Sequence, residues 1–188
     1  MALDLHAAQI QGFFDIPVDH LFFRPVMIDY FKPQSSEDLV VVSPDAGGVE
    51  RARSVAKRLN APLAIIDKRR EEANVAEVMN VIGDVADQDC LIVDDLIDTA
   101  GTLVKGAEAL LEYGARSVTA CATHAVLSGP AVQRIAESGI KEVVLSDSIP
   151  LSDAAKACGK IRQLSVAPLL ARAVQSIHEE TSVSALFL

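Results

Sequence analysis

The chain has 188 residues, of which 50% are hydrophobic, and its formal net charge at pH 7 is −9. This length is enough for one hydrophobic core, or for one domain with a small additional piece. The acidic balance argues against a nucleic-acid surface, and no apolar stretch is long enough to cross a bilayer, so we expect neither nucleic acid nor a membrane as a partner.

The first 21 residues differ in pattern from the rest of the chain. They begin like the end of a β-strand with no partner strand before it, and a separate helix is predicted at residues 24–34. We therefore expect a boundary near Leu21, with residues 1–21 as the end of an amino-terminal domain that is otherwise missing from this sequence.

From residue 38 onwards, short apolar runs alternate with amphipathic segments. The apolar runs predict strands, and apolar residues at helical spacing predict helices, one of them stopped by Gly114. The alternation predicts an α/β domain at residues 22–165, with a mostly parallel sheet covered by helices on both faces. The predicted strands cover residues 38–43, 62–67, 90–95, 117–125 and 141–148, and the predicted helices cover residues 49–60, 102–115 and 130–139.

Two further segments complete the predicted organisation. The charged run at residues 68–74 indicates a loop between two strands. An amphipathic helix is predicted at residues 165–180, and we expect residues 166–188 to form a carboxy-terminal helix and tail that packs back toward the amino-terminal domain.

The sequence LIVDDLIDTAGTL at residues 91–103 joins the end of a predicted strand to the beginning of a predicted helix. Ligands of open parallel sheets bind beyond the carboxyl ends of the strands. Backbone N–H groups and hydroxyls of residues 99–102 can surround a phosphate, which the helix N-terminus also attracts. Asp94 and Asp95 are suited to accept hydrogen bonds from sugar hydroxyls, or to orient water around Mg²⁺.

The alternative for this motif is an aspartate-rich helix N-cap. A cap needs a single acidic residue, whereas the motif has two at the strand end and a third three residues later. The pattern therefore favours a sugar-phosphate site, whose candidate residues are Asp94, Asp95, Asp98, Thr99, Ala100, Gly101 and Thr102.

Three other features are ambiguous from the residues alone. The glycines of the sequence SPDAGG at residues 43–48 allow backbone amides to approach an anion, but a plain tight turn would also contain them. The cations at residues 68–70 are typical of a solvated loop. His6, a single histidine in an apolar segment, is more typical of a core residue than of a ligand.

Motifs of other enzyme classes are absent from the sequence. It contains neither G-x-x-x-x-G-K-[ST] nor G-x-G-x-x-G, which excludes a P-loop kinase and the dinucleotide fingerprint. Its three cysteines form no C-x-x-C pair, so we expect buried thiols in a cytoplasmic protein.

The motif at residues 91–103 resembles the phosphoribosyl-diphosphate signature of the phosphoribosyltransferase fold. The other matching stretches are similar to ribose-phosphate diphosphokinase, the enzyme family that makes phosphoribosyl diphosphate from ATP and ribose 5-phosphate. This resemblance covers nearly the whole chain, and it is carried by residues 4–21, 41–59, 63–85, 122–129, 146–151 and 182–187.

The resemblance implies further roles for individual residues. Lys68 and Arg70 would be the catalytic cations of a mobile loop, with Arg70 also at the ribose 5-phosphate. His6 and Asp45 would hold Mg²⁺ with ATP. The pyrophosphate loop would consist of Asp45, Ala46, Gly47 and Gly48.

The family also implies a larger assembly and a second domain. Its members are homo-oligomers in which dimers form a ring, and they carry a further domain with the adenine pocket before the position where this chain begins. We therefore expect little or no synthetase activity from this chain alone. The alternatives are a phosphoribosyltransferase that consumes phosphoribosyl diphosphate and a non-catalytic regulatory homologue.

Overall fold

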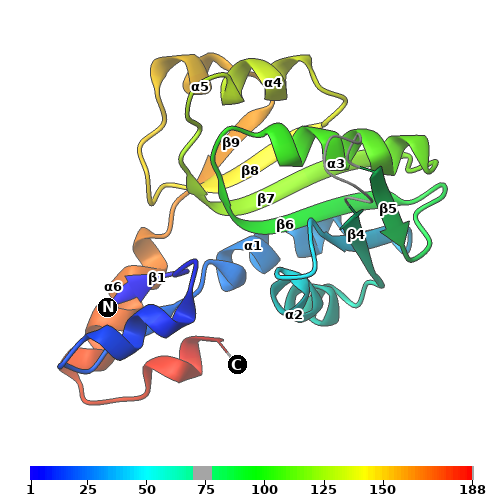
Figure 1. The fold of residues 1–188 in the computed structure, drawn as a ribbon. Helices are drawn as coiled ribbons and strands as arrows, with labels where there is room; N and C mark the ends of the chain where they lie inside the picture. The colour runs from blue at the N-terminus through cyan, green and yellow to red at the C-terminus, as the bar shows by residue number, and fades with distance from the viewer. Residues whose placement is uncertain (70–77, 188) are drawn as a thin grey trace.

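A seven-stranded sheet forms the centre of the computed structural model, which describes residues 1–69 and 78–187 (Figure 1). The strand order is β5-β4-β3-β6-β7-β8-β9. All neighbours pair in parallel except the edge strand β5, which is antiparallel to β4. The predicted α/β fold with a mostly parallel sheet is therefore confirmed.

All five predicted strands are present, and the sheet contains two that the sequence did not predict. The unpredicted strands are β5 (Val78–Ile82) and β9 (Ile161–Leu164), which lie at the two edges of the sheet. The two inner residues of β9 are exposed and polar, so this strand lacks the apolar run that marks the central ones. The predicted strands are β3 (Leu39–Ser43), β4 (Leu63–Arg69), β6 (Asp89–Ile97), β7 (Ser117–Ala125) and β8 (Glu142–Ser146).

Helices cover both faces of this sheet, as predicted. Helices α1 (Arg24–Phe31) and α2 (Val49–Leu59) pack on one face, together with the beginning of α6 (Ala167–His178). Helices α3 (Gly101–Glu112), α4 (Ala131–Glu137) and the unpredicted α5 (Asp153–Ala157) pack on the other face. Figure 1 shows α3, α4 and α5 on the opposite side of the strands from α1 and α2.

Two glycines determine how α3 fits onto the sheet. Gly114 has a φ of +89°, so it ends the helix as the sequence predicted. A Cβ at Gly106 would lie 2.9 Å from Cδ1 of Ile66, so the absence of a side chain lets the middle of α3 approach β4 closely.

The chain changes direction across the sheet between β3 and β6, which are adjacent strands. After β3 the chain passes through α2 to β4 on one side, and after β6 it passes through α3 to β7 on the other side. The two connections leave a crevice at the carboxyl ends of β3 and β6, the position where open α/β sheets bind ligands. The motif at residues 91–103 and the turn at residues 43–48 meet there.

Strands β4 and β5 form an arm that extends beyond the rest of the sheet. Ile65 is the last β4 residue that pairs with β3, whereas β4 and β5 remain paired as far as Arg69 and Val78. Residues 68 and 69 of the loop expected at residues 68–74 therefore belong to β4, and residues 70–74 lie outside the described residues. The backbone of Lys68 lies three residues, or about 10 Å, beyond Ile65 on the same edge as the crevice.

Residues 1–21 form a small unit of their own beside the carboxy-terminal helix (Figure 1). Strand β1 (Ala2–Leu3) pairs in parallel with β2 (His20–Leu21), so the strand-like start, for which the sequence suggested no partner, has one within the chain. Between them lies the 3₁₀-helix η1 (Ala8–Phe13), and Phe13 is 88% exposed. The domain boundaries at residues 21 and 165 stay predictions.

The carboxy-terminal tail reaches the beginning of α1. The 3₁₀-helix η3 (Val183–Phe187) follows α6, and the rings of Phe187 and Phe22 meet edge to face at 5.5 Å. Arg24 donates a hydrogen bond to the carbonyl oxygen of Phe187 at 3.2 Å. A further short 3₁₀-helix, η2 (Lys32–Gln34), extends α1.

In the described part of the chain, no helix is both long enough and apolar enough to cross a membrane.

Candidate sugar-phosphate site

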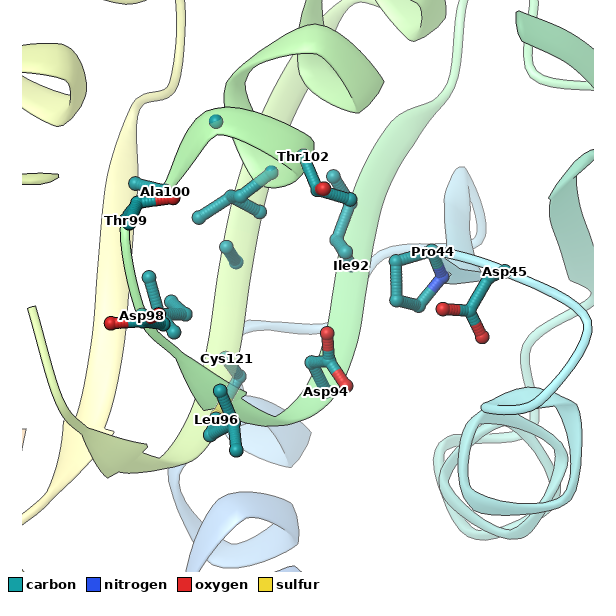
Figure 2. Close-up of a pocket in the computed structure, with 14 residues that line it drawn as sticks. Pro44, Asp45, Ile92, Asp94, Leu96, Asp98, Thr99, Ala100, Thr102 and Cys121 are labelled. Carbon is teal, nitrogen blue, oxygen red and sulfur yellow. The ribbon is translucent and has the colours of Figure 1, made fainter. Parts of the chain in front are cut away.

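A cavity of about 330 Å³ lies at the crevice between β3 and β6. Figure 2 shows the turn of residues 98–102 along the left and top of this cavity, with Asp94 and the Pro44–Asp45 segment on its right. The structure therefore brings together the two turns that the sequence singled out separately. The cavity is lined by Pro44, Asp45, Ile92, Asp94, Leu96, Ile97, Asp98, Thr99, Ala100, Gly101, Thr102, Leu103, Ala120 and Cys121.

The turn after β6 has the backbone geometry of an anion-binding loop. Ala100 adopts a left-handed conformation with φ +58°, and the right-handed α3 begins at Gly101. The N-cap residue of α3, Ala100, provides no side-chain cap, so it leaves the first N–H groups of the helix for another acceptor. Successive N–H groups at such a left-to-right transition form a concave site for anions, and the helix dipole adds positive potential.

Asp94 and Asp95 point to different surroundings. Consecutive strand residues face opposite sides of a sheet, and here only Asp94 lines the cavity. The side chain of Asp95 is 4% exposed and lies on the side of the amino-terminal segment. The structure therefore brings Asp94, but not Asp95, together with the turn of residues 98–102.

Two basic side chains contact the Asp95 carboxylate. Nδ1 of His6 lies 2.7 Å from one oxygen of Asp95, and Nη1 of Arg51 lies 3.4 Å from the other. The same Nη1 atom lies 3.4 Å from Oδ1 of Asp94, so Arg51 links both aspartates. His6, Arg51 and Asp94 also line a second cavity, of about 360 Å³, on the side of α1, α2 and the amino-terminal segment.

This arrangement separates the pKa values of the two aspartates. Burial and the hydrogen bond with Asp95 raise the pKa of Asp94 to about 7 against the opposing charge of Arg51. Burial acts to raise the pKa of Asp95 too, but hydrogen bonds with Asp94 and His6 and the charge of Arg51 outweigh it and hold that pKa below its ordinary value. Asp95 is thus charged at neutral pH, whereas Asp94 changes its charge near pH 7.

The turn after β3 is organised around Asp45. Its Oδ1 atom accepts a hydrogen bond of 2.9 Å from the N–H of Gly48, the residue before the first residue of α2. A Cβ at Gly48 would lie 3.0 Å from Oγ of Ser43, which leaves little room for any other residue. Asp45 and Pro44 line the cavity, while Ala46 and Gly47 are exposed beside it.

The structure describes only some of the remaining predicted site residues. The backbone of Lys68 belongs to the β4–β5 arm, at the edge of the sheet where the cavity lies. Arg70 lies outside the described residues. Ser128 donates a hydrogen bond to the Asp98 carboxylate, which is exposed at the rim.

The carboxylates at the cavity fit a magnesium ion better than His6 does. Mg²⁺ prefers oxygen and commonly uses one or two carboxylates together with substrate phosphates. Asp45 and Asp94 supply such oxygens, whereas the Nδ1 atom of His6 contacts Asp95. Among the described residues, no three acidic, histidine or cysteine side chains gather into a preformed metal site.

Sequence reasoning missed the residues that hold the site together. Arg51 belongs to the polar side of a predicted helix, and nothing local indicates that it reaches two aspartates more than 40 positions away. Asp4 also escaped notice, although its buried carboxylate accepts hydrogen bonds of 2.7 Å from the N–H of Phe23 and the hydroxyl of Thr123. His124 contacts the carbonyl oxygens of Leu3 and Asp4 at 3.1 Å.

Comparison with known proteins points to one family. A family model described as the phosphoribosyl synthetase-associated domain matches residues 70–188. Over the whole chain, the sequence is 62% identical to a ribose-phosphate pyrophosphokinase of Neisseria meningitidis and 61% identical to one of Caldanaerobacter subterraneus. The chain spans 57% and 59% of the length of these two relatives.

A solved structure agrees with this match. The crystal structure of phosphoribosylpyrophosphate synthetase from Mycobacterium smegmatis superimposes with a TM-score of 0.84 at 42% sequence identity. The likeness covers 95% of this chain and 58% of that one. The similarity therefore extends over nearly all of this chain.

Proposed function

This chain belongs to the ribose-phosphate pyrophosphokinase family, and from that premise we propose that it carries the ribose 5-phosphate and pyrophosphate sites of such an enzyme. The reaction would transfer the diphosphoryl group of ATP to the 1-hydroxyl of ribose 5-phosphate, giving phosphoribosyl diphosphate and AMP. The observation that carries this proposal is the single cavity at which the turn of residues 98–102 faces Asp94 and the Asp45 turn.

Each part of the cavity has a chemical task in this proposal. The backbone N–H groups of residues 98–102 would bind the 5-phosphate, and the Asp94 carboxylate would accept hydrogen bonds from ribose hydroxyls. The turn of residues 45–48 would bind the pyrophosphate. Asp95 would act mainly by holding Arg51 and His6 beside Asp94.

The cations of the arm would act at the transferring group. Negative charge spreads over the diphosphoryl group in the transition state, and cations that meet it only there raise the rate. We assign this role to Lys68 and Arg70. Mg²⁺, held by Asp45 together with substrate phosphates and with His6 as a further candidate, would neutralise phosphate charge when bound.

Two alternatives share parts of this site. A phosphoribosyltransferase would use the same phosphate turn, and a regulatory homologue would keep the fold alone. Synthesis of phosphoribosyl diphosphate is favoured because the relatives that match the whole chain at 61–62% identity are pyrophosphokinases. All the candidate carboxylates and cations are also present in the sequence.

Binding of ribose 5-phosphate to this chain tests the proposal directly. By calorimetry, we expect Asp94→Asn to weaken binding about tenfold to thirtyfold, the size expected for losing charge-assisted hydrogen bonds. Asp29→Asn removes the same charge from an exposed position on α1 and should change the affinity little. Equal affinities of wild type and Asp94→Asn, or no binding by the wild type, would refute the assignment.

The affinity for ribose 5-phosphate should also depend on pH in a defined direction. The pKa of Asp94 is raised to about 7, and its ionised form accepts hydroxyl hydrogen bonds more strongly than its protonated form does. Affinity should therefore rise by about fivefold to tenfold between about pH 6 and about pH 8, measured by calorimetry with EDTA present.

The control for this pH dependence is Asp94→Asn. The phosphate of the ligand itself titrates near pH 6, so part of the rise belongs to the ligand. The asparagine variant keeps that part and loses the part due to Asp94. Parallel pH profiles for the two proteins would show that Asp94 is not the titrating group.

Assembly and location belong to the same proposal. We infer a homo-oligomer of dimers that assemble into a ring, supported by exposed apolar side chains of the amino-terminal segment such as Phe13, Phe14 and Ile16. A cytoplasmic location is supported by Cys90, Cys121 and Cys158, which are all free thiols.

A further inference from the structure

The phosphate turn is held on its outer side by the segment that follows β7. The N–H of Leu127 donates to the carbonyl oxygen of Ile97 at 2.9 Å, and the N–H of Ser128 donates to that of Asp98 at 3.1 Å. Nη1 of Arg134, on α4, donates to the carbonyl oxygen of Thr99 at 2.9 Å. Three consecutive carbonyl groups, that of the last residue of β6 and those of the first two residues of the turn, are therefore bound by one neighbouring segment.

These hydrogen bonds determine where the N–H groups of the turn point. In a trans peptide, the carbonyl oxygen of one residue and the N–H of the next point in opposite directions, and the described part of the chain has no cis peptide bond. Binding the carbonyls of residues 97–99 on the outer side therefore directs the N–H groups of residues 98–100 away from it. Among the described residues, Leu127, Ser128 and Arg134 do not line the cavity, whereas residues 98–103 do.

Arg134 is the only one of these three donors that depends on a side chain. The bonds from Leu127 and Ser128 come from the backbone and continue the β6–β7 ladder, so most substitutions would keep them. The bond from Arg134 holds the peptide before Ala100, whose left-handed conformation is unfavourable for a non-glycine residue. Removing Arg134 would leave that conformation without its side-chain support.

The charge of Arg134 lies near the same point. A Cβ at Gly101 would lie 3.3 Å from Nη1 and 3.9 Å from Cζ of Arg134, so the guanidinium rests against the first residue of α3. The helix N-terminus carries partial positive charge there, and the guanidinium adds to it. The field at the turn is thus suited to a phosphate monoester, which carries nearly two negative charges at neutral pH.

We propose that Arg134 is a positioning residue of the phosphate site: by binding the Thr99 carbonyl it directs the N–H of Ala100 toward the phosphate of a sugar-phosphate ligand. This inference rests on the proposed function, because it assigns the turn of residues 98–102 to a phosphate. It extends that function to an exposed residue of α4 that contacts the turn but does not line the cavity.

The test compares Arg134→Met with Arg134→Lys in this chain. By calorimetry, Arg134→Met should weaken binding of ribose 5-phosphate and of inorganic phosphate about tenfold, because the N–H of Ala100 loses its fixed direction. Arg134→Lys, whose ammonium can donate to the same carbonyl, should keep most of the affinity. Arg172→Met removes the same charge from an exposed position on α6 and should have little effect.

A spectroscopic measurement separates this role from a general loss of stability. In amide NMR spectra, Arg134→Met should shift the signals of residues 99–101 and reduce their response to added inorganic phosphate, while the signals of the Asp45 turn stay unchanged. Arg134→Met with wild-type phosphate affinity, or Arg172→Met with an equal loss, would overturn the inference. Failure of the proposed function gives a different result, since the wild type itself would then bind neither phosphate ligand.

Discussion

Replacing Lys68 with alanine is expected to lower kcat by roughly a hundredfold to a thousandfold, the typical loss when one preorganised electrostatic donor is removed. KM should change much less, because a cation that meets charge only in the transition state contributes little to substrate binding. The β4–β5 arm carries the Lys68 backbone to the edge of the sheet where the cavity lies.

The measurement requires a protein that turns over. A chimera that joins this chain to the part of the Neisseria meningitidis relative that it does not match can be assayed for AMP release from ATP and ribose 5-phosphate. Lys57→Ala, which removes an exposed cation from α2, is the matched control. A kcat loss of less than about tenfold for Lys68→Ala would show that Lys68 does not contact the transferring group in the transition state.

The parts of the site that are local in sequence could be predicted from it. The turn of residues 98–102 follows an apolar strand and opens an amphipathic helix, so its position at the carboxyl edge of the sheet could be inferred from the order of elements. The same applies to the turn of residues 45–48. Both inferences need only the periodicity of neighbouring residues and the rule for ligand sites in parallel sheets.

The pairing of distant side chains could not be predicted in this way. His6 reaches Asp95 across 89 positions, and Arg134 reaches Thr99 from a helix whose polar side looks like any solvated surface. One signal was available for the two aspartates. Consecutive residues of a strand face opposite sides of the sheet, so the different surroundings of Asp94 and Asp95 could have been predicted. The left-handed backbone of Ala100 had no such signal, since alanine is not a residue that favours positive φ.

The amino-terminal segment is attached to the sheet through a buried carboxylate, and this attachment leads to the second large expected effect. One oxygen of Asp4 accepts 2.7 Å hydrogen bonds from the N–H of Phe23 and the hydroxyl of Thr123, and Asp4 is only 9% exposed. Asp4→Ala would leave both donors buried without a partner. We expect it to lower the free energy of unfolding by roughly 3 kcal/mol.

Two further variants serve as comparisons for the loss of stability expected from Asp4→Ala. Asp4→Asn keeps one oxygen that can accept both hydrogen bonds as neutral ones, so it should cost roughly 1 kcal/mol. Asp15→Ala removes an exposed carboxylate from the same segment and should change stability by less than about 0.5 kcal/mol. Urea unfolding followed by circular dichroism measures all three variants. Because His6 lies two residues after Asp4 and contacts Asp95, loosening this attachment should also disturb the contact between His6 and Asp95. Equal stability of Asp4→Ala and Asp15→Ala would mean that the segment is held by its apolar contacts rather than by Asp4.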